Sequence, residues 1–195
     1  MNFNVEGMMR PHLHLSTQLL GRHQAMNAAV AVGIVESLQK FSLHISEKAI
    51  KNGIAKTRWP GRLEIVKQNP FVVLDGAHNP GSCKVLVQAI KDIFPKKKII
   101  LILGVSHDKD RKGICRELNA IAAQVILTKA DNPRAFDFKK VNTKILFPKK
   151  EVVISKNLKE GLHLAAKKAG PNDIILVTGS LFIVGEARKL CINPI

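Results

Sequence analysis

The sequence has no tyrosine, one tryptophan and three cysteines, and each scarcity argues against a class of protein. Cys83, Cys115 and Cys191 are far apart and form no Cys-x-x-Cys pair, so neither a disulfide framework nor a zinc site is indicated. Aromatic residues make up 5% of the chain, which leaves few side chains on which nucleic-acid bases could stack. We therefore interpret the three thiols as buried and inert, and we expect no metal site in this chain.

Long hydrophobic runs are also absent. No apolar segment approaches the roughly 20 residues that a helix needs to span a bilayer. The first residues lack the basic and apolar regions of a signal peptide. We therefore expect a cytoplasmic protein with no membrane partner.

Acidic residues are few, 15 against 31 lysines and arginines, and the formal net charge is +16. Such a charge is typical of nucleic-acid-binding proteins, whose affinity depends on Lys and Arg contacts with phosphates. In this chain, however, lysines form short runs at the ends of predicted elements, namely 96–98, 139–140, 149–150 and 167–168. We interpret them as a solvated surface that attracts small anions, and we expect no nucleic-acid partner.

After residue 61 the chain alternates regularly between strand and helix signals. Apolar residues at helical spacing predict helices around 86–93 and 158–166. Short apolar runs predict strands at 71–74, 99–104, 123–128, 151–154 and 173–178. The pattern indicates an α/β fold, a Rossmann-like, mostly parallel sheet with flanking helices, in which all strand-to-helix turns lie at one edge.

The first 60 residues follow a different pattern. Residues 1–20 show only short extended pieces, and we expect them to be irregular. The alanine-rich segment 21–40 predicts a helix, and Ser46 predicts the N-cap of a second one. The Pro60-Gly61 pair breaks this pattern, and a strand is expected to follow at 62–66. We therefore predict two domains, 1–58 and 59–195.

The most informative stretch runs from Val72 to Pro80, where a buried strand is followed at once by a polar turn. In open α/β sheets ligands bind just beyond the carboxyl ends of the strands, so Asp75 and His78 are candidate site residues. Gly76 would let the backbone approach a ligand closely. The chemistry suits an anionic, oxygen-rich substrate. An equally good interpretation is that Asp75 only caps the helix starting near Pro80 and that His78 packs against a loop.

Other positions are candidates with similar alternatives. Asn27 lies four residues after His23, so both share one helical face, where they could meet a ligand or only cap and pack the helix start. Arg62, at the domain junction, could bind phosphate or be an ordinary surface arginine. Ser180 follows a strand and opens a helix, where it could bind an anion or act only as an N-cap. The charged residues 108–110 are interpreted as a solvated loop.

Six motifs in this order resemble the folylpolyglutamate synthase and dihydrofolate synthase family of the Mur ligase superfamily. The resemblance covers residues 13–190. The motifs are Leu-Gly-Arg-His-Gln-x-x-Asn-Ala-Ala at 20–29, Trp-Pro-Gly-Arg at 59–62, Leu-Asp-Gly-Ala-His-Asn-Pro at 74–80, Gly-x-x-x-Asp-Lys-Asp at 104–110, Asn-Pro-Arg-Ala at 132–135 and Gly-Ser-Leu-x-x-x-Gly at 179–185.

The resemblance implies an ATP-dependent ligase that activates a folate or dihydropteroate carboxylate as an acyl phosphate, which the amine of L-glutamate attacks to form an amide. It implies ATP-binding roles for Asn27, Arg62 and Asp75. It also implies catalytic roles for Asp75, His78 and Ser180, the last two on the glutamate side of the cleft. ATP and Mg²⁺ are the implied cofactors, and a monomer is expected.

One departure from the family pattern limits what this chain can do alone. Complete members carry a Gly-x-x-Gly-Lys-Ser/Thr phosphate-binding loop and magnesium ligands, and this sequence contains no Gly-Lys-Ser or Gly-Lys-Thr. We expect a fragment made of the tail of a central ATP-binding domain, with exposed apolar surface on residues 13–40, and a whole C-terminal domain. Two alternatives stay open: a Mur-type ligase acting on another acid, and a non-catalytic basic binding module.

Overall fold

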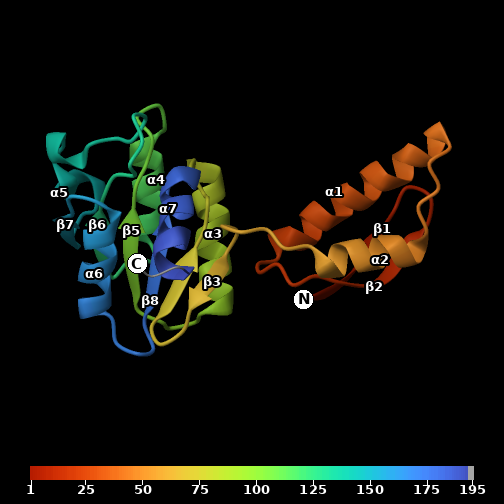
Figure 1. Cartoon of the computed structure of the whole chain (residues 1–195), viewed down its shortest axis with the longest axis horizontal. Helices are drawn as coiled ribbons and strands as arrows, with labels where there is room; N and C mark the ends of the chain where they lie inside the picture. The colour runs from red at the N-terminus through yellow and green to blue at the C-terminus, as the bar shows by residue number, and fades with distance from the viewer. Residues whose placement is uncertain (193–195) are drawn as a thin grey trace. The chain divides into compact units, whose positions relative to one another are not determined.

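The computed structural model describes residues 1–192, so the last three residues of the predicted 59–195 domain lie outside the described part. The chain divides into two compact units, Met1–Pro60 and Gly61–Ile195, here called unit 1 and unit 2. Figure 1 shows the elements of each unit. The division falls at the Pro60-Gly61 pair, two residues after the predicted boundary.

Unit 1 combines a β-hairpin with two helices. Its elements are β1 (Asn2–Glu6), β2 (Pro11–Ser16), α1 (His23–Leu38), the 3₁₀ turn η1 (Gln39–Phe41) and α2 (Glu47–Lys56). The short extended pieces expected within residues 1–20 are present as β1 and β2, but they are not irregular, because the two strands pair antiparallel along most of their length. The predicted helices are present, and Ser46 caps α2 by accepting a hydrogen bond from the Ala49 N–H at 3.2 Å.

The core of unit 1 is small and adjoins a polar cluster centred on His12. Val5, Leu15, Val32 and Ile50 bring the two strands and two helices together. Beside them, the fully buried His12 lies between two carboxylates, with its Nε2 2.9 Å from Glu36 and its Nδ1 2.8 Å from Glu47. The hydrogen bond between His12 and Glu36 therefore ties β2 to α1, whereas the close contact with Glu47 at the start of α2 is not aligned as a hydrogen bond.

Unit 2 contains a six-stranded sheet in the order β3-β4-β8-β5-β6-β7. The strands are β3 (Glu64–Lys67), β4 (Phe71–Leu74), β5 (Ile99–Leu103), β6 (Gln124–Leu127), β7 (Glu151–Ile154) and β8 (Ile174–Thr178). All neighbours pair in parallel except β3, which is antiparallel to β4. The five predicted parallel strands and the α/β fold class are confirmed, and the predicted 62–66 strand is β3, which starts at Glu64.

Helices cover both faces of this sheet (Figure 1). They are α3 (Pro80–Ile93), α4 (Arg111–Asn119), η2 (Phe138–Lys140), α5 (Thr143–Leu146), α6 (Leu158–Lys168) and α7 (Leu181–Ile192). One side of the sheet buries its apolar side chains against α6 and α7. Successive side chains of a strand point to opposite faces, so the remaining side chains point to the other side of the sheet. On that side α3 packs beside α4, and α4 packs beside α5.

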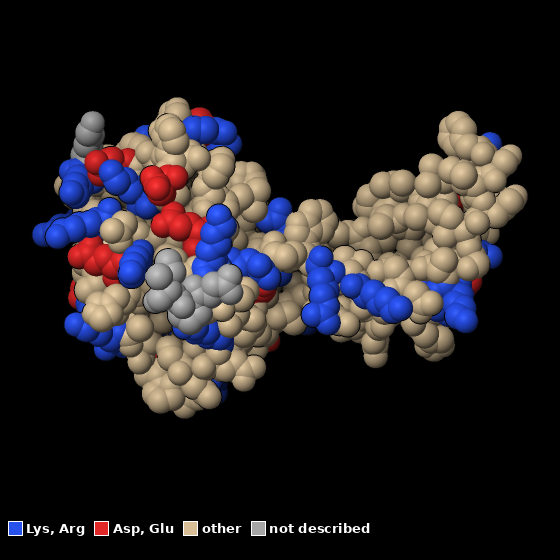
Figure 2. All heavy atoms as spheres, viewed as in Figure 1, with Lys and Arg blue, Asp and Glu red and all other residues tan. Residues whose placement is uncertain are grey.

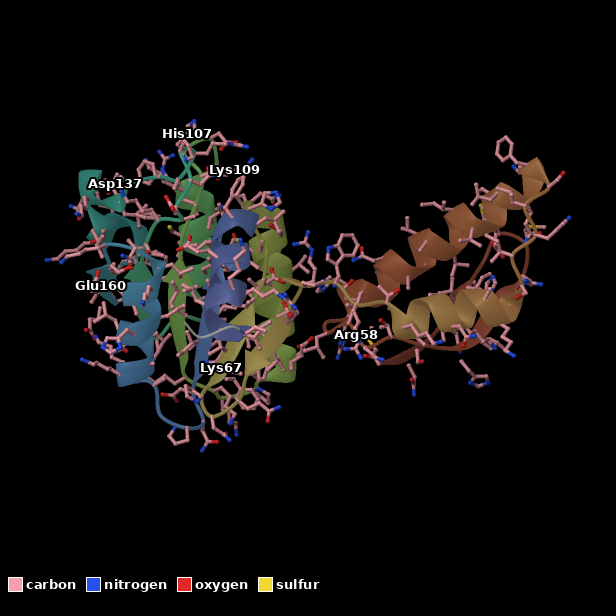
Figure 3. The ribbon with its side chains drawn as sticks, in the orientation of Figure 1. Arg58, Lys67, His107, Lys109, Asp137 and Glu160 are labelled. Atoms are coloured by element: carbon pink, nitrogen blue, oxygen red, sulfur yellow. The ribbon has the colours of Figure 1, made fainter. Side chains whose placement is uncertain are left out.

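The chain leaves neighbouring strands toward opposite faces at three places. β8 leads into α7, whereas its neighbours β4 and β5 lead into α3 and α4 on the other face. The same holds for β6, which leads toward α5, and β7, which leads into α6. Such switch points open crevices at the carboxyl ends of the strands. Figure 3 shows His107 and Lys109, from the loop after β5, at one end of unit 2 and Lys67, from the end of antiparallel β3, at the other.

Basic residues are scattered on the face shown in Figure 2, where Lys and Arg side chains alternate with uncharged surface and, over unit 2, with Asp and Glu side chains. Among the described residues, no helix is long and apolar enough to cross a membrane.

Candidate functional site at the carboxyl edge of the sheet

The turn after β4 is built around the buried carboxylate of Asp75. Its Oδ1 accepts a hydrogen bond from the Ala77 N–H at 2.9 Å, and its Oδ2 accepts one from the Leu63 N–H at 3.0 Å. Asp75 does not cap the following helix, because Asn79 does so by accepting from the Ser82 N–H at 2.8 Å. The carboxylate therefore joins the turn after β4 to the segment that carries Arg62.

Arg62 lies against the backbone of this turn. The Gly76 N–H donates to the Gly61 carbonyl at 2.8 Å, which holds the two segments together. A Cβ atom on residue 76 would collide with the Arg62 guanidinium and with Leu181 at the start of α7. Glycine at position 76 therefore creates the space through which the arginine passes.

His78 has a defined ring orientation. Its Nδ1 donates to the Gly76 carbonyl at 2.9 Å, and its backbone N–H donates to the Ser82 hydroxyl at 3.1 Å. Since a carbonyl can only accept, Nδ1 carries a hydrogen, and in the neutral ring Nε2 has a free lone pair. His78 is half-buried, so this nitrogen can act as a hydrogen-bond acceptor or a base.

The Thr178–Ser180 turn is hydrogen-bonded to the turn after β4. The Gly179 N–H donates to the Ala77 carbonyl at 2.9 Å, and the Thr178 hydroxyl donates to the same oxygen at 3.3 Å. Gly179 has φ +105°, a conformation that favours glycine. Ser180 is buried, and its Oγ accepts from the Phe182 N–H at 3.2 Å, so it does act as a cap of α7.

Five site residues were predicted. The structure brings four of them together in unit 2, namely Arg62, Asp75, His78 and Ser180. Asn27, the fifth, belongs to unit 1. Its side-chain amide donates to Gln24 at 2.9 Å, and Gln24 in turn hydrogen-bonds to His23 at 3.1 Å. These side chains therefore contact one another at the start of α1, where no described side chain forms a cap hydrogen bond.

A narrow crevice lies at the switch point between β8 and β5. It contains two polar residues that were not among the predicted site residues, Ser106 and Asn132. Its lining consists of Gly104, Val105, Ser106, Ala130, Asn132, Ala135, Ser180 and Phe182. Ser106 lies within the motif at 104–110 and Asn132 within the motif at 132–135. Their places in these motifs could have identified both as candidate site residues.

The loop at 104–110 is an ordered network rather than only a solvated charged loop. Asp108 pairs with Lys109 at 3.0 Å and with Arg134 at 3.2 Å. The hydrogen bond from Lys109 is the main reason why the pKa of Asp108 falls to about 2. Asp110 caps α4, a helix that was not predicted, by accepting a hydrogen bond from the Gly113 N–H at 2.9 Å.

Within residues 1–192, no group of three His, Cys, Asp or Glu side chains is arranged to hold a metal ion. The three cysteines are all buried as free thiols, as predicted. Burial is the main cause that raises the pKa of Cys83 and of Cys115 to about 12 and that also raises the pKa of Cys191.

Comparison with known families supports the motif-based resemblance. Residues 61–181 match the family described as Mur ligase, glutamate ligase domain. The dihydrofolate synthase/folylpolyglutamate synthase of Bacillus subtilis is 33% identical over 182 residues, which cover 90% of this chain and 40% of that protein. A probable bifunctional folylpolyglutamate synthase/dihydropteroate synthase of Haloferax volcanii is 36% identical over 183 residues, 90% of this chain and 20% of that protein.

Solved structures agree with these matches. Folylpolyglutamate synthase of Mycobacterium tuberculosis, complexed with ADP and AMPPCP, superposes with a TM-score of 0.83 at 29% identity, covering 94% of this chain and 43% of that one. FolC of Escherichia coli in complex with DHPP and ADP gives a TM-score of 0.81 at 25% identity, with 94% and 42% covered. The chain therefore spans less than half the length of these relatives.

Proposed function

Because this chain belongs to the Mur ligase family through its glutamate ligase domain, we propose that it forms part of an ATP-dependent ligase that adds L-glutamate to folate, to dihydropteroate, or to both. The observation that carries the proposal is the Asp75-centred hydrogen bonding, which fixes Arg62, His78 and Ser180 at one edge of the sheet. The relatives named above are synthases of this reaction class.

In the proposed reaction, an oxygen of the acid's carboxylate attacks the γ-phosphorus of ATP and ADP leaves. The amine of glutamate then attacks the acyl carbon, and phosphate leaves as the amide forms. Such a site acts mainly by positioning its reactants and by stabilising the charge that develops on them.

Each residue of the cluster has a role suited to its chemistry. Arg62 would pair with ATP phosphates through its planar guanidinium. Asp75, whose two oxygens accept backbone hydrogen bonds, would position Arg62 and His78 and orient the nucleotide. Nε2 of His78 would accept a proton from the glutamate ammonium group, which leaves the free amine that attacks the acyl carbon. Ser180 would donate its hydroxyl hydrogen to a glutamate carboxylate, since it donates to no acceptor among the described residues.

We propose that the phosphate-binding loop and the Mg²⁺ ligands come from a part of the enzyme outside these 195 residues. Two observations support this. The sequence has no Gly-Lys-Ser or Gly-Lys-Thr, and no three-ligand metal group occurs among the described side chains. Unit 1 would be the end of the ATP-binding domain, with Asn27 as its nucleotide contact.

The surface of α1 supports this view of unit 1. Met26, Val30 and Ile34 follow one another at four-residue spacing on one helical face, and they are 70%, 63% and 58% exposed. An apolar stripe of this kind is normally buried against another element. We propose that it packs against the rest of the ATP-binding domain, as the expected exposed surface on residues 13–40 suggested.

The test is glutamate-dependent and acid-dependent release of ADP. The chain should be assayed alone and together with a phosphate-binding-loop domain, with folate, dihydropteroate and unrelated carboxylic acids as substrates. We expect no turnover by the isolated chain and turnover by the completed enzyme with folate or dihydropteroate. Turnover with another acid only would favour a different Mur-type ligase, and salt-dependent nucleic-acid binding without turnover would favour a basic binding module.

A further inference from the structure

The switch point between β6 and β7 forms a crevice that the proposed ligase reaction does not use. It is lined by Thr128, Lys129, Asp137, Phe138, Lys139, Ile154, Ser155 and Lys156. None of these residues lines the crevice beside Ser180. Figure 3 shows Asp137 at the same end of unit 2 as His107 and Lys109, which agrees with the carboxyl edge of the strands.

The charge of this lining is positive. Three lysines, Lys129, Lys139 and Lys156, are exposed, and among the described residues no ion pair joins them to a carboxylate. The one acidic lining residue, Asp137, accepts a hydrogen bond from the backbone N–H of Lys139 at 3.0 Å. The neighbouring Glu160 likewise accepts from the Lys156 N–H at 2.5 Å. The three lysines therefore outnumber the acidic groups, and both carboxylates are engaged by the backbone.

Thr128, one of the lining residues, also carries a buried hydroxyl that lacks a partner. The Thr128 hydroxyl is buried, with only 2% of the residue exposed, and it hydrogen-bonds to none of the described residues. By contrast, the other buried hydroxyl in the lining, on Ser155, donates to the Asn157 carbonyl at 3.0 Å. A buried hydroxyl without a partner is costly, so a group from outside the protein is expected to satisfy it.

We propose that this crevice binds one oxygen of a small oxyanion, a carboxylate or a phosphate. The Thr128 hydroxyl would donate to that oxygen, and Lys129, Lys139 and Lys156 would neutralise its charge. The enclosed space is about 10 Å³, so a single oxygen would enter and the rest of the anion would stay at the open rim among the lysines. The location follows the rule that ligands of open α/β sheets bind at switch points. The inference does not depend on the proposed ligase function.

The test is a titration of the full chain followed by the NMR shifts of the Thr128, Lys129 and Ser155 amides. Acetate and inorganic phosphate are the probes, and chloride at matched ionic strength controls for screening. We expect saturable shifts with at least one oxyanion and none with chloride. A response to acetate alone would identify a carboxylate site, and a response to phosphate alone a phosphate site.

Variants then separate a built site from general surface charge. Thr128→Val should weaken oxyanion binding about fivefold or more, because it removes one hydrogen bond to a charged group, while Thr128→Ser should restore it. Lys129→Ala should weaken binding severalfold, and Lys84→Ala on α3 should leave it unchanged. Absence of saturable shifts, as expected if the hydroxyl only binds water, would overturn the inference. Equal binding by the Thr128→Val and wild-type chains would overturn it as well.

Discussion

Replacing Asp75 by asparagine should destabilise unit 2 through one identifiable pair of hydrogen bonds. The two carboxylate oxygens accept from the Leu63 and Ala77 N–H groups at 3.0 and 2.9 Å. In Asp75→Asn one oxygen becomes an NH₂ donor, so one of the two amide N–H groups faces a donor. A buried donor left without an acceptor costs about 1–3 kcal/mol.

For a unit of this size, that loss corresponds to a decrease of about 3–12 °C in the midpoint of thermal unfolding. Hydrogen exchange gives a sharper readout, because Asp75→Asn should deprotect one of the two amides and Asp75→Ala should deprotect both. Asp131→Asn, at an exposed position, is the matched control and should change neither quantity. Unchanged midpoint and unchanged protection of both amides in Asp75→Asn would refute the structural role of this carboxylate.

Three further predictions concern other parts of the molecule. Gly179→Ala should destabilise unit 2 by more than 1 kcal/mol, measured by denaturant unfolding, because φ is +105° and a Cβ would lie 2.6 Å from a backbone oxygen. Burial would raise the pKa of Glu36, but hydrogen bonds from His12 and two backbone N–H groups outweigh it and lower that pKa. A lowered carboxyl pKa stabilises the fold above the ordinary value of 4.5, so unit 1 should lose stability in circular dichroism titrations as the pH falls below it, and His12→Gln should reduce this dependence. Cys83 and Cys115, with pKa values near 12, should resist alkylation in the folded chain and react after unfolding, as mass spectrometry would show.

The sheet was predictable because its strands are short apolar runs bounded by turn residues, such as Ile99–Leu103, which is buried throughout. The hairpin in unit 1 was not, because its register depends on pairing between two weak segments, and Pro11 lies at the end of that pairing, opposite Glu6. Helix α4 was missed because it opens with Arg111 and Lys112, which continue the charged run at 108–110.

Site residues were predictable where local sequence positions them, as with His78 two residues after Gly76. Contacts between distant segments were not. The Leu63 N–H reaches Asp75 only after β3 and β4 pair, and Ser106 joins the Ser180 crevice only after β5 and β8 become neighbours. These contacts depend on the order of the strands in the sheet, which residue spacing in the sequence does not reveal.

The most direct test of the proposed site is to compare Arg62→Ala and His78→Ala in the enzyme completed with its phosphate-binding-loop domain. Steady-state rates should be measured against ATP and against glutamate, with Arg116→Ala and His163→Ala as exposed controls. Arg62→Ala should reduce kcat/KM for ATP about tenfold to a hundredfold, because a charge-assisted contact contributes about 1.5–3 kcal/mol. His78→Ala should lower kcat for amide formation with little change in KM for ATP. Wild-type kcat and KM for both substrates in both variants would show that these turns have only a structural role and would contradict the proposed site.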